Sequence, residues 1–153
     1  MDKVKVSDKL LLSVEKPARY TGGELNSIVK ETARLRFALC FPDVYEIGMS
    51  HLGSRILYEV INSREEYACE RCFAPWPDME KAMRENNVPI FTLETRTPLA
   101  ECDIVGFSLL YEMCYTNILT MLDLAHIHKR SADRGENEPI IVAGGGCACN
   151  PEP

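Results

Sequence analysis

The chain has 153 residues, and its Asp and Glu residues outnumber its Lys and Arg residues by 23 to 17, which gives a formal net charge of −6. Apolar residues make up 46% of the chain, which is typical of one globular domain and excludes a disordered, collagen-like or coiled-coil protein. The acidic balance argues against a nucleic-acid partner. No apolar run reaches the roughly 18 residues of a membrane span, so we expect no membrane partner. Nothing at the N-terminus is typical of a signal peptide, so the sequence predicts a cytoplasmic protein with reduced cysteines.

Regular secondary structure is predicted from residue 35 onward, after a polar N-terminal extension over residues 1–34. Within that extension, only residues 24–33 are expected to form a short helix. Beyond it, apolar runs that end at turn residues predict strands at residues 35–41, 67–73, 90–93, 103–109 and 140–143. The segments between them predict helices at residues 48–61, 79–86 and 111–125.

This alternation of strands and helices predicts an α/β fold. The expected architecture is a flavodoxin-like (Rossmann-like), doubly wound and mainly parallel five-stranded sheet with helices on both faces. Such sheets bind ligands beyond the carboxyl ends of their strands, near the point where the strand order reverses. In the helix at 48–61, apolar residues recur at helical spacing and form one face, which consists of Leu52, Ile56, Leu57, Val60 and Ile61.

Three short motifs fall at the ends of predicted strands. An Asp-x-Tyr-x-x-Gly sequence follows the first strand, Ser-x-Leu ends the fourth, and Gly-Gly ends the fifth. In this order they resemble the Asp-x-His-x-x-Gly, Ser-x-Leu and Gly-Gly motifs of cobalamin-binding domains. The resemblance implies a corrinoid ligand, cobalamin, whose nucleotide tail enters a slot lined by the serine and the glycines. The candidate cofactor-binding residues are Asp43, Tyr45, Gly48, Ser108, Leu110, Gly144 and Gly145.

Tyr45 stands where that family has the histidine that ligates cobalt. A phenol is a poor ligand near neutral pH because its pKa is about 10. Because position 45 is a tyrosine, histidine ligation there is excluded. If cobalamin binds, the cobalt either lacks a protein ligand or is approached by Tyr45. Two neighbours are open to simpler interpretations. Asp43 could cap the following helix, and His51 could have a structural role or face the pocket.

Longer stretches resemble the N-terminal part of a family of radical S-adenosylmethionine (SAM) proteins that carry a cobalamin-binding domain. The stretches are Lys16–Glu24, Phe41–Gly53, Phe73–Met79, Tyr115–Leu119 and Asn150–Pro153. The resemblance implies that residues 35–153 form a cobalamin-binding-like domain. It also implies that a barrel-like radical SAM domain follows residue 153, as the partner that binds a 4Fe-4S cluster and S-adenosylmethionine.

The cluster motif of such domains, Cys-x-x-x-Cys-x-x-Cys, does not occur in these 153 residues. A 4Fe-4S cluster needs its cysteine thiolates at the required intervals. We therefore expect this chain to be a fragment that is not catalytic by itself. The parent protein would belong to a class that transfers methyl groups or performs other radical reactions.

Two other functions stay open. The domain could have lost its cofactor and act as a structural or interaction module, because Tyr45 replaces histidine and a long interval separates Gly48 from Ser108. A weaker alternative is a small zinc-binding protein.

The zinc alternative depends on Cys69-x-x-Cys72, which has a suitable ligand spacing and which Cys147 and Cys149 could complete. Residues three apart in a strand point to opposite faces, which argues against such a site. No metal ligand is therefore predicted. The remaining cysteines, Cys40, Cys102 and Cys114, are expected in or near the core.

Overall fold

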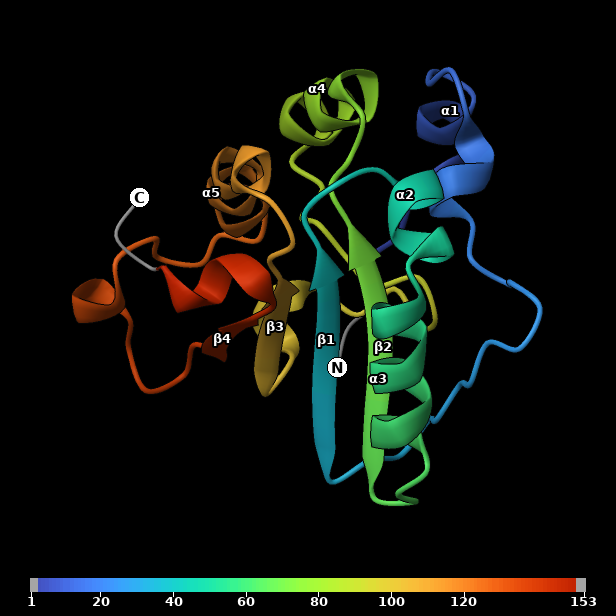
Figure 1. Ribbon diagram of the computed structural model, residues 1–153. Coiled ribbons are helices and arrows are strands. Elements are labelled where there is room, and N and C mark those ends of the chain that lie inside the picture. Colours follow the sequence, from blue (N-terminus) through green and yellow to red (C-terminus); the bar gives the residue numbers. More distant parts are fainter. Residues whose placement is uncertain (1–2, 151–153) are drawn as a thin grey trace.

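The computed structural model describes residues 3–150. Within them, four parallel strands form one sheet in the order β2-β1-β3-β4 (Figure 1). The strands are β1 (Leu35–Phe41), β2 (Tyr67–Phe73), β3 (Ile104–Ser108) and β4 (Ile140–Gly144). The helices are α1 (Asp8–Leu11), α2 (Tyr45–Ser50), α3 (Leu52–Asn62), α4 (Pro77–Asn86) and α5 (Tyr115–Leu124). The chain therefore has the predicted α/β fold with a parallel sheet.

Strand β1 lies between β2 and β3, so the strand order reverses beside it. The chain passes from β1 to β2 in one direction and later returns past β1 to β3 and β4. Because ligands of open α/β sheets bind outside the carboxyl ends of the strands where the order reverses, the ends of β1 and β3 mark the place to look for a site.

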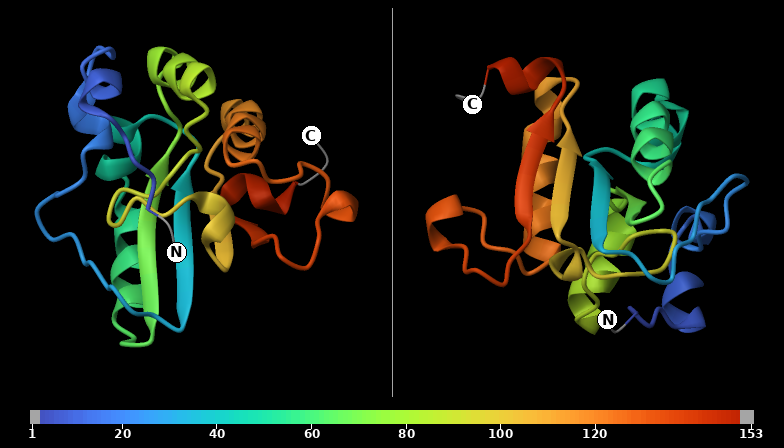
Figure 2. Two further views of the ribbon diagram at one scale, coloured as in Figure 1. Left: turned by 180° about the vertical axis from the view of Figure 1, so that it is seen from behind. Right: turned by 90° about the horizontal axis from the view of Figure 1, so that it is seen from below.

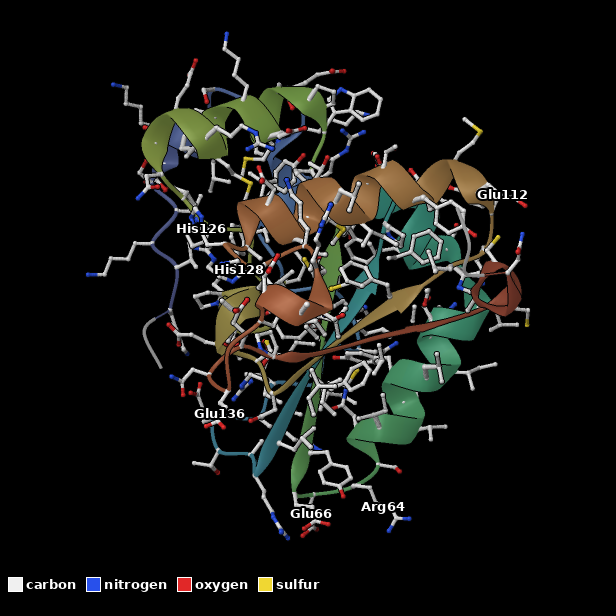
Figure 3. All side chains as sticks on the ribbon, turned by 90° about the vertical axis from the view of Figure 1, so that its left-hand side faces the viewer. Arg64, Glu66, Glu112, His126, His128 and Glu136 are labelled. Carbon is white, nitrogen blue, oxygen red and sulfur yellow. The ribbon has the colours of Figure 1, made fainter. Side chains whose placement is uncertain are left out.

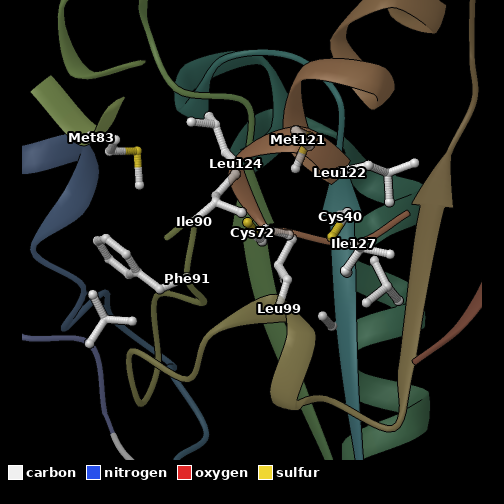
Figure 4. Packing of buried hydrophobic residues seen from close by; sticks show 14 of the residues in the cluster. Cys40, Cys72, Met83, Ile90, Phe91, Leu99, Met121, Leu122, Leu124 and Ile127 are labelled. Carbon is white, nitrogen blue, oxygen red and sulfur yellow. The ribbon is translucent and has the colours of Figure 1, made fainter. Parts of the chain in front are cut away.

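One face of the sheet, which we call the closed face, is covered by α4 and α5 (Figure 2). Its core includes Leu99 and Met121, both 0% exposed, together with Cys40 and Cys72 from the sheet (Figure 4). The N-terminal extension also contributes to this core, through Val4, Val6, Leu10 and Val14. The part of the extension between Val4 and Val14 therefore packs against the sheet domain.

The opposite face, which we call the open face, is covered mainly by α3 among residues 3–150, and α3 lies over β1 and β2 (Figure 2). The predicted apolar side chains of α3 are mostly turned to solvent, with exposures from 48% for Leu57 to 65% for Leu52. Polar side chains face the sheet instead. Asn62 bonds the backbone N–H and C=O of Cys69, each at 3.0 Å, and Tyr58 is buried. These contacts orient α3 and leave its apolar side without a cover among residues 3–150.

The expected strand at residues 90–93 is not formed, so the described sheet has four strands where the sequence predicts five. The segment makes only an isolated bridge, between Phe91 and Pro98. Its backbone bonds are divided among three partners, since Ile90 N–H donates to Leu124 O and Leu93 N–H donates to Arg71 O, while the N–H of residue 92 donates to the C=O of residue 97. The run is apolar because it is buried, and a short buried run does not by itself distinguish strand from loop.

Two helix predictions also differ from the structure. Residues 24–33 form no helix, since Asn26 adopts a left-handed φ of 68° and the Ile28 N–H donates to Tyr58 Oη at 2.7 Å. The predicted helix at 48–61 is two helices, α2 and α3, because His51 between them has the extended ψ of 111°. The break allows the His51 side chain to cap α3.

Candidate functional site

A slot of about 480 Å³ opens on the open face, between α3 and strands β1, β3 and β4. Side chains alternate along a strand, and Val105 and Phe107 belong to the closed-face core. The neighbouring positions Gly106 and Ser108 of β3 therefore face the slot. Four of the predicted residues line it, namely Ser108, Leu110, Gly144 and Gly145. The fold thus brings two of the three sequence motifs together at the carboxyl ends of β3 and β4.

The slot is apolar along the sheet and becomes more polar toward the strand ends. Its floor includes the Phe37 ring, which lies over Gly106, where an added Cβ would overlap the ring. Val142 of β4 and Leu57 of α3 extend the apolar lining. Its polar side chains, those of Ser108 and His51, lie at the carboxyl end. This gradient suits a ligand with an apolar ring at one end and polar groups at the other.

Gly144 and Gly145 serve different purposes. Gly144 pairs with Ser108 at the end of the β3–β4 ladder, and a Cβ added there would meet no atom within 4 Å. Gly145 has a φ of 120°, and its added Cβ would overlap the carbonyl of Leu109. Gly145 is therefore required by the backbone. Gly144 is not, and its missing side chain leaves space open in the slot.

His51 joins the slot lining from the start of α3. Its Nδ1 accepts the Ser54 backbone N–H at 3.0 Å and lies 2.8 Å from Ser54 Oγ. The chain's other two histidines, His126 and His128, lie at the opposite end of α5 from Glu112 (Figure 3). Since Glu112 follows the carboxyl end of β3, His51 is the histidine at the slot. The sequence allowed either a structural role or a place in the pocket for His51. In the structure it has both, because its ring caps α3 and lines the slot.

Asp43 and Gly48 of the first motif do not line the slot. The Asp43 carboxylate accepts hydrogen bonds from the Tyr111 hydroxyl and from the Val44 N–H, the latter at 2.7 Å, so it links the loops that follow β1 and β3. It does not cap α2, whose N-cap is Val44. An added Cβ at Gly48 would overlap the Phe73 ring, so this glycine allows α2 to pack closely on β2.

Tyr45 also lies outside the slot lining. Its ring packs edge-on against Phe73, with the two centroids 5.5 Å apart. Burial, together with the negative charge of Glu24, raises the pKa of the Tyr45 phenol above its usual value. The side chain therefore stays protonated near neutral pH. A protonated phenol is a weak metal ligand, so this geometry gives Tyr45 a packing role.

The cysteines form no shared metal site among residues 3–150. Cys69 packs with Leu39 and Tyr58 on the open face, whereas Cys72 lies in the closed-face core. The two thiols of the Cys-x-x-Cys motif therefore point to opposite sides of β2. Burial raises the pKa of Cys69 and of Cys102 to about 12, which leaves both as unreactive thiols.

A buried charged cluster that the sequence did not reveal lies beside a second cavity, of about 460 Å³, bounded by α2, α3 and strands β1 and β2. Arg71 donates from Nε to Glu94 Oε1 at 2.6 Å, and from Nη2 to Ser27 Oγ at 2.8 Å. Its guanidinium carbon also lies 4.5 Å from the centre of the Tyr58 ring. Because Arg71 also pairs with Ser27 and Glu24, the cluster fastens the N-terminal extension to β2. Its members are far apart in sequence, so no local pattern could indicate them.

The sequence profile of the family described as "Radical SAM proteins, N-terminal" matches residues 53–153, which is more than half of the chain. The chain belongs to this family. The matched range contains β3, β4 and all of α3 except Leu52, and hence most of the slot lining. No curated protein and no solved structure matches this radical SAM N-terminal chain. Within residues 3–150, none of its helices has the length and apolar character needed to cross a bilayer.

Proposed function

We propose that this radical SAM N-terminal domain binds cobalamin, with the nucleotide tail of the corrinoid in the slot beside α3. The observation that carries the proposal is the convergence of Ser108, Leu110, Gly144 and Gly145 on one open slot at the strand ends. The slot volume of about 480 Å³ lies within the range of about 300–1,000 Å³ typical of small-molecule sites. The ligand class follows from the motif resemblance and from the polarity of the lining.

The lining suits the parts of such a tail. Phe37, Leu57 and Val142 provide an apolar surface for a planar aromatic base, and the bare Gly144 leaves room above the sheet. The Ser108 hydroxyl, at the strand end, would bond the more polar ribose and phosphate. The slot lining contains no Lys, Arg, Asp or Glu, so recognition would depend on shape and neutral hydrogen bonds.

A bound corrinoid supplies a cobalt centre that can accept and donate a methyl group. Tyr45 packs on Phe73 outside the slot lining and stays protonated, so we expect the cobalt to have no ligand from this residue. In the parent protein, the reaction would require the radical SAM domain, with its 4Fe-4S cluster and S-adenosylmethionine. The role proposed for residues 35–153 is to hold the corrinoid at the carboxyl edge of the sheet, toward that domain.

The test uses two glycines that both have room for a side chain. Leucine at Gly144 would project into the slot, whereas leucine at Gly135, in the loop before β4, would meet no neighbour within 4 Å. Hydroxocobalamin is added to the wild-type chain, to Gly144→Leu and to Gly135→Leu. Binding is followed by the visible spectrum and by retention through gel filtration. We expect wild type and Gly135→Leu to retain the corrinoid and Gly144→Leu to lose it. Absence of retention by the wild type would refute the proposal.

A cofactor-free interaction module is the second candidate, and the exposed apolar side of α3 favours it. Leu52, Ile56 and Val60 are each more than half exposed, which is unusual for three residues along one helix face. If the wild type binds no corrinoid, this surface becomes the main functional feature of the domain.

A further inference from the structure

The His51 ring is held in one orientation by three neighbours. Its Nδ1 accepts the Ser54 backbone N–H at 3.0 Å and lies 2.8 Å from Ser54 Oγ. The ring packs on Phe41 in a tilted arrangement, with the two ring centroids 5.3 Å apart. The ring also lies over Gly53, where an added Cβ would come within 2.7 Å of His51 Cε1. The sequence His-Leu-Gly-Ser at the start of α3 therefore builds a rigid support for this side chain.

These contacts determine which ring nitrogen is available. Because Nδ1 accepts a backbone N–H, it carries no proton, and the neutral ring bears its proton on Nε2. Neither anchoring contact uses Nε2. A histidine that binds a metal through Nε2 needs that nitrogen unprotonated, and it usually donates from Nδ1 to a carboxylate or a carbonyl. His51 has the reverse arrangement, which suits a hydrogen-bond donor and not a metal ligand.

The position of His51 in the slot indicates what it would donate to. It lies at the carboxyl end, on the α3 side, while Ser108 lies at the end of β3. An aromatic base on the apolar floor near Phe37 would place the phosphodiester of a nucleotide tail toward these two polar groups. With no Lys or Arg in the lining, a phosphate oxygen there would depend on neutral donors, for which His51 Nε2–H is preoriented.

We propose that His51 is a binding residue that donates from Nε2 to the phosphodiester of the corrinoid's nucleotide tail, and that it does not ligate cobalt. This inference rests on the cobalamin binding proposed above. The site would then recognise the nucleotide tail of the corrinoid and not its corrin ring. Cobalamin, which has the tail, should therefore depend on His51, and cobinamide, which has the corrin ring and cobalt but no nucleotide, should not.

The experiment measures dissociation constants of hydroxocobalamin and diaquocobinamide for the wild type and for His51→Asn. Asparagine is a favoured N-cap, so this variant keeps the start of α3 but cannot reach the slot. The matched control is His126→Asn, at a position of left-handed φ (57°) that asparagine tolerates, outside the slot lining and at the end of α5 opposite Glu112. We expect His51→Asn to weaken cobalamin binding about tenfold or more, as for the loss of a hydrogen bond to a charged group. Cobinamide binding should be unchanged, and so should both affinities of the control.

A second readout examines the cobalt itself. Chain labelled with ¹⁵N-histidine is loaded with cob(II)alamin, and its electron paramagnetic resonance spectrum should equal that of the ¹⁴N chain. A change in nitrogen splitting on labelling, or equal loss of both corrinoids in His51→Asn, would show that His51 acts at the cobalt or corrin and would overturn the inference. Unchanged cobalamin affinity in His51→Asn would overturn it while leaving the proposed function intact. Failure of the wild type to bind cobalamin would instead refute the proposed function.

Discussion

The two faces of the sheet are built differently. On the closed face, α4, α5 and the N-terminal extension bury a continuous core around Leu99 and Met121. On the open face, α3 covers only β1 and β2, and β4 leaves Ile140 64% exposed. Both faces belong to the same four strands, so this difference does not arise from strand propensity. It arises from which helices cover each side.

The closed face therefore stabilises the fold, whereas the open face is available for binding. Side chains on the closed face are enclosed by neighbours, and each contributes to the free energy of folding. Apolar side chains on the open face are still in contact with water, so they contribute little to folding and remain available to a ligand or partner. The slot lies where the open face meets the carboxyl ends of the strands, and four of the seven candidate residues line it.

The largest effect is expected for the buried ion pair of the closed face. Arg36 and Glu70 have side-chain exposures of 8% and 1%, and Thr95 Oγ1 donates to the same carboxylate at 2.7 Å. Arg36→Met leaves a buried carboxylate without its cation, so we expect a loss of about 3–5 kcal/mol in urea unfolding. Adding Glu70→Gln to this variant should restore most of the loss. A loss below about 1 kcal/mol for Arg36→Met would contradict a closed, water-free face.

Apolar truncation should distinguish the faces directly. Leu99→Ala, at a fully buried position, should cost about 2–5 kcal/mol in unfolding free energy because it removes contacts and leaves a cavity. Ile140→Ala, on the open face, should change the unfolding free energy by less than about 0.5 kcal/mol. Equal losses for the two variants would mean that the open face is also enclosed in solution.

The glycine pair at the end of β4 should respond unequally. Gly145→Ala forces a side chain onto a φ of 120° and against Leu109, so it should cost about 1–3 kcal/mol in thermal or urea unfolding. Gly144→Ala, where a Cβ has open space, should leave stability nearly unchanged. A reversed order would contradict the separate roles of the two glycines.

The smallest effect concerns the loop that leads into β4. The backbone N–H groups of His128 and Gly135, followed by the His128 ring, lower the pKa of Glu138 to about 2. The contacts favour the ionised carboxylate, so they are fully present above the ordinary pKa and are lost as the pH falls toward 2. A ¹³C NMR titration of the Glu138 carboxyl should give a midpoint near 2. A midpoint above 4 would show that the loop is not held in this way.

The sequence predicted the strands β1 and β2 to the residue, because each is a seven-residue run that ends at a clear boundary. It also placed Ser108 and Gly144 at the ends of two successive predicted strands, and the structure adds that these strands are neighbours whose register pairs the two residues. It did not predict the loop at residues 90–93, since burial without pairing produces the same apolar pattern as a strand. The outward orientation of α3 was equally hidden, because it depends on contacts of Asn62 and Tyr58 with distant backbone.

Hydrogen–deuterium exchange with and without hydroxocobalamin tests the central claim, that the open face is the ligand-binding face, most directly. We predict slower exchange at the start of α3, near His51, and around Ser108 and Gly144, with little change in α4 and α5. Protection confined to α4 and α5, or no protection in a chain that retains the corrinoid, would contradict the proposed site.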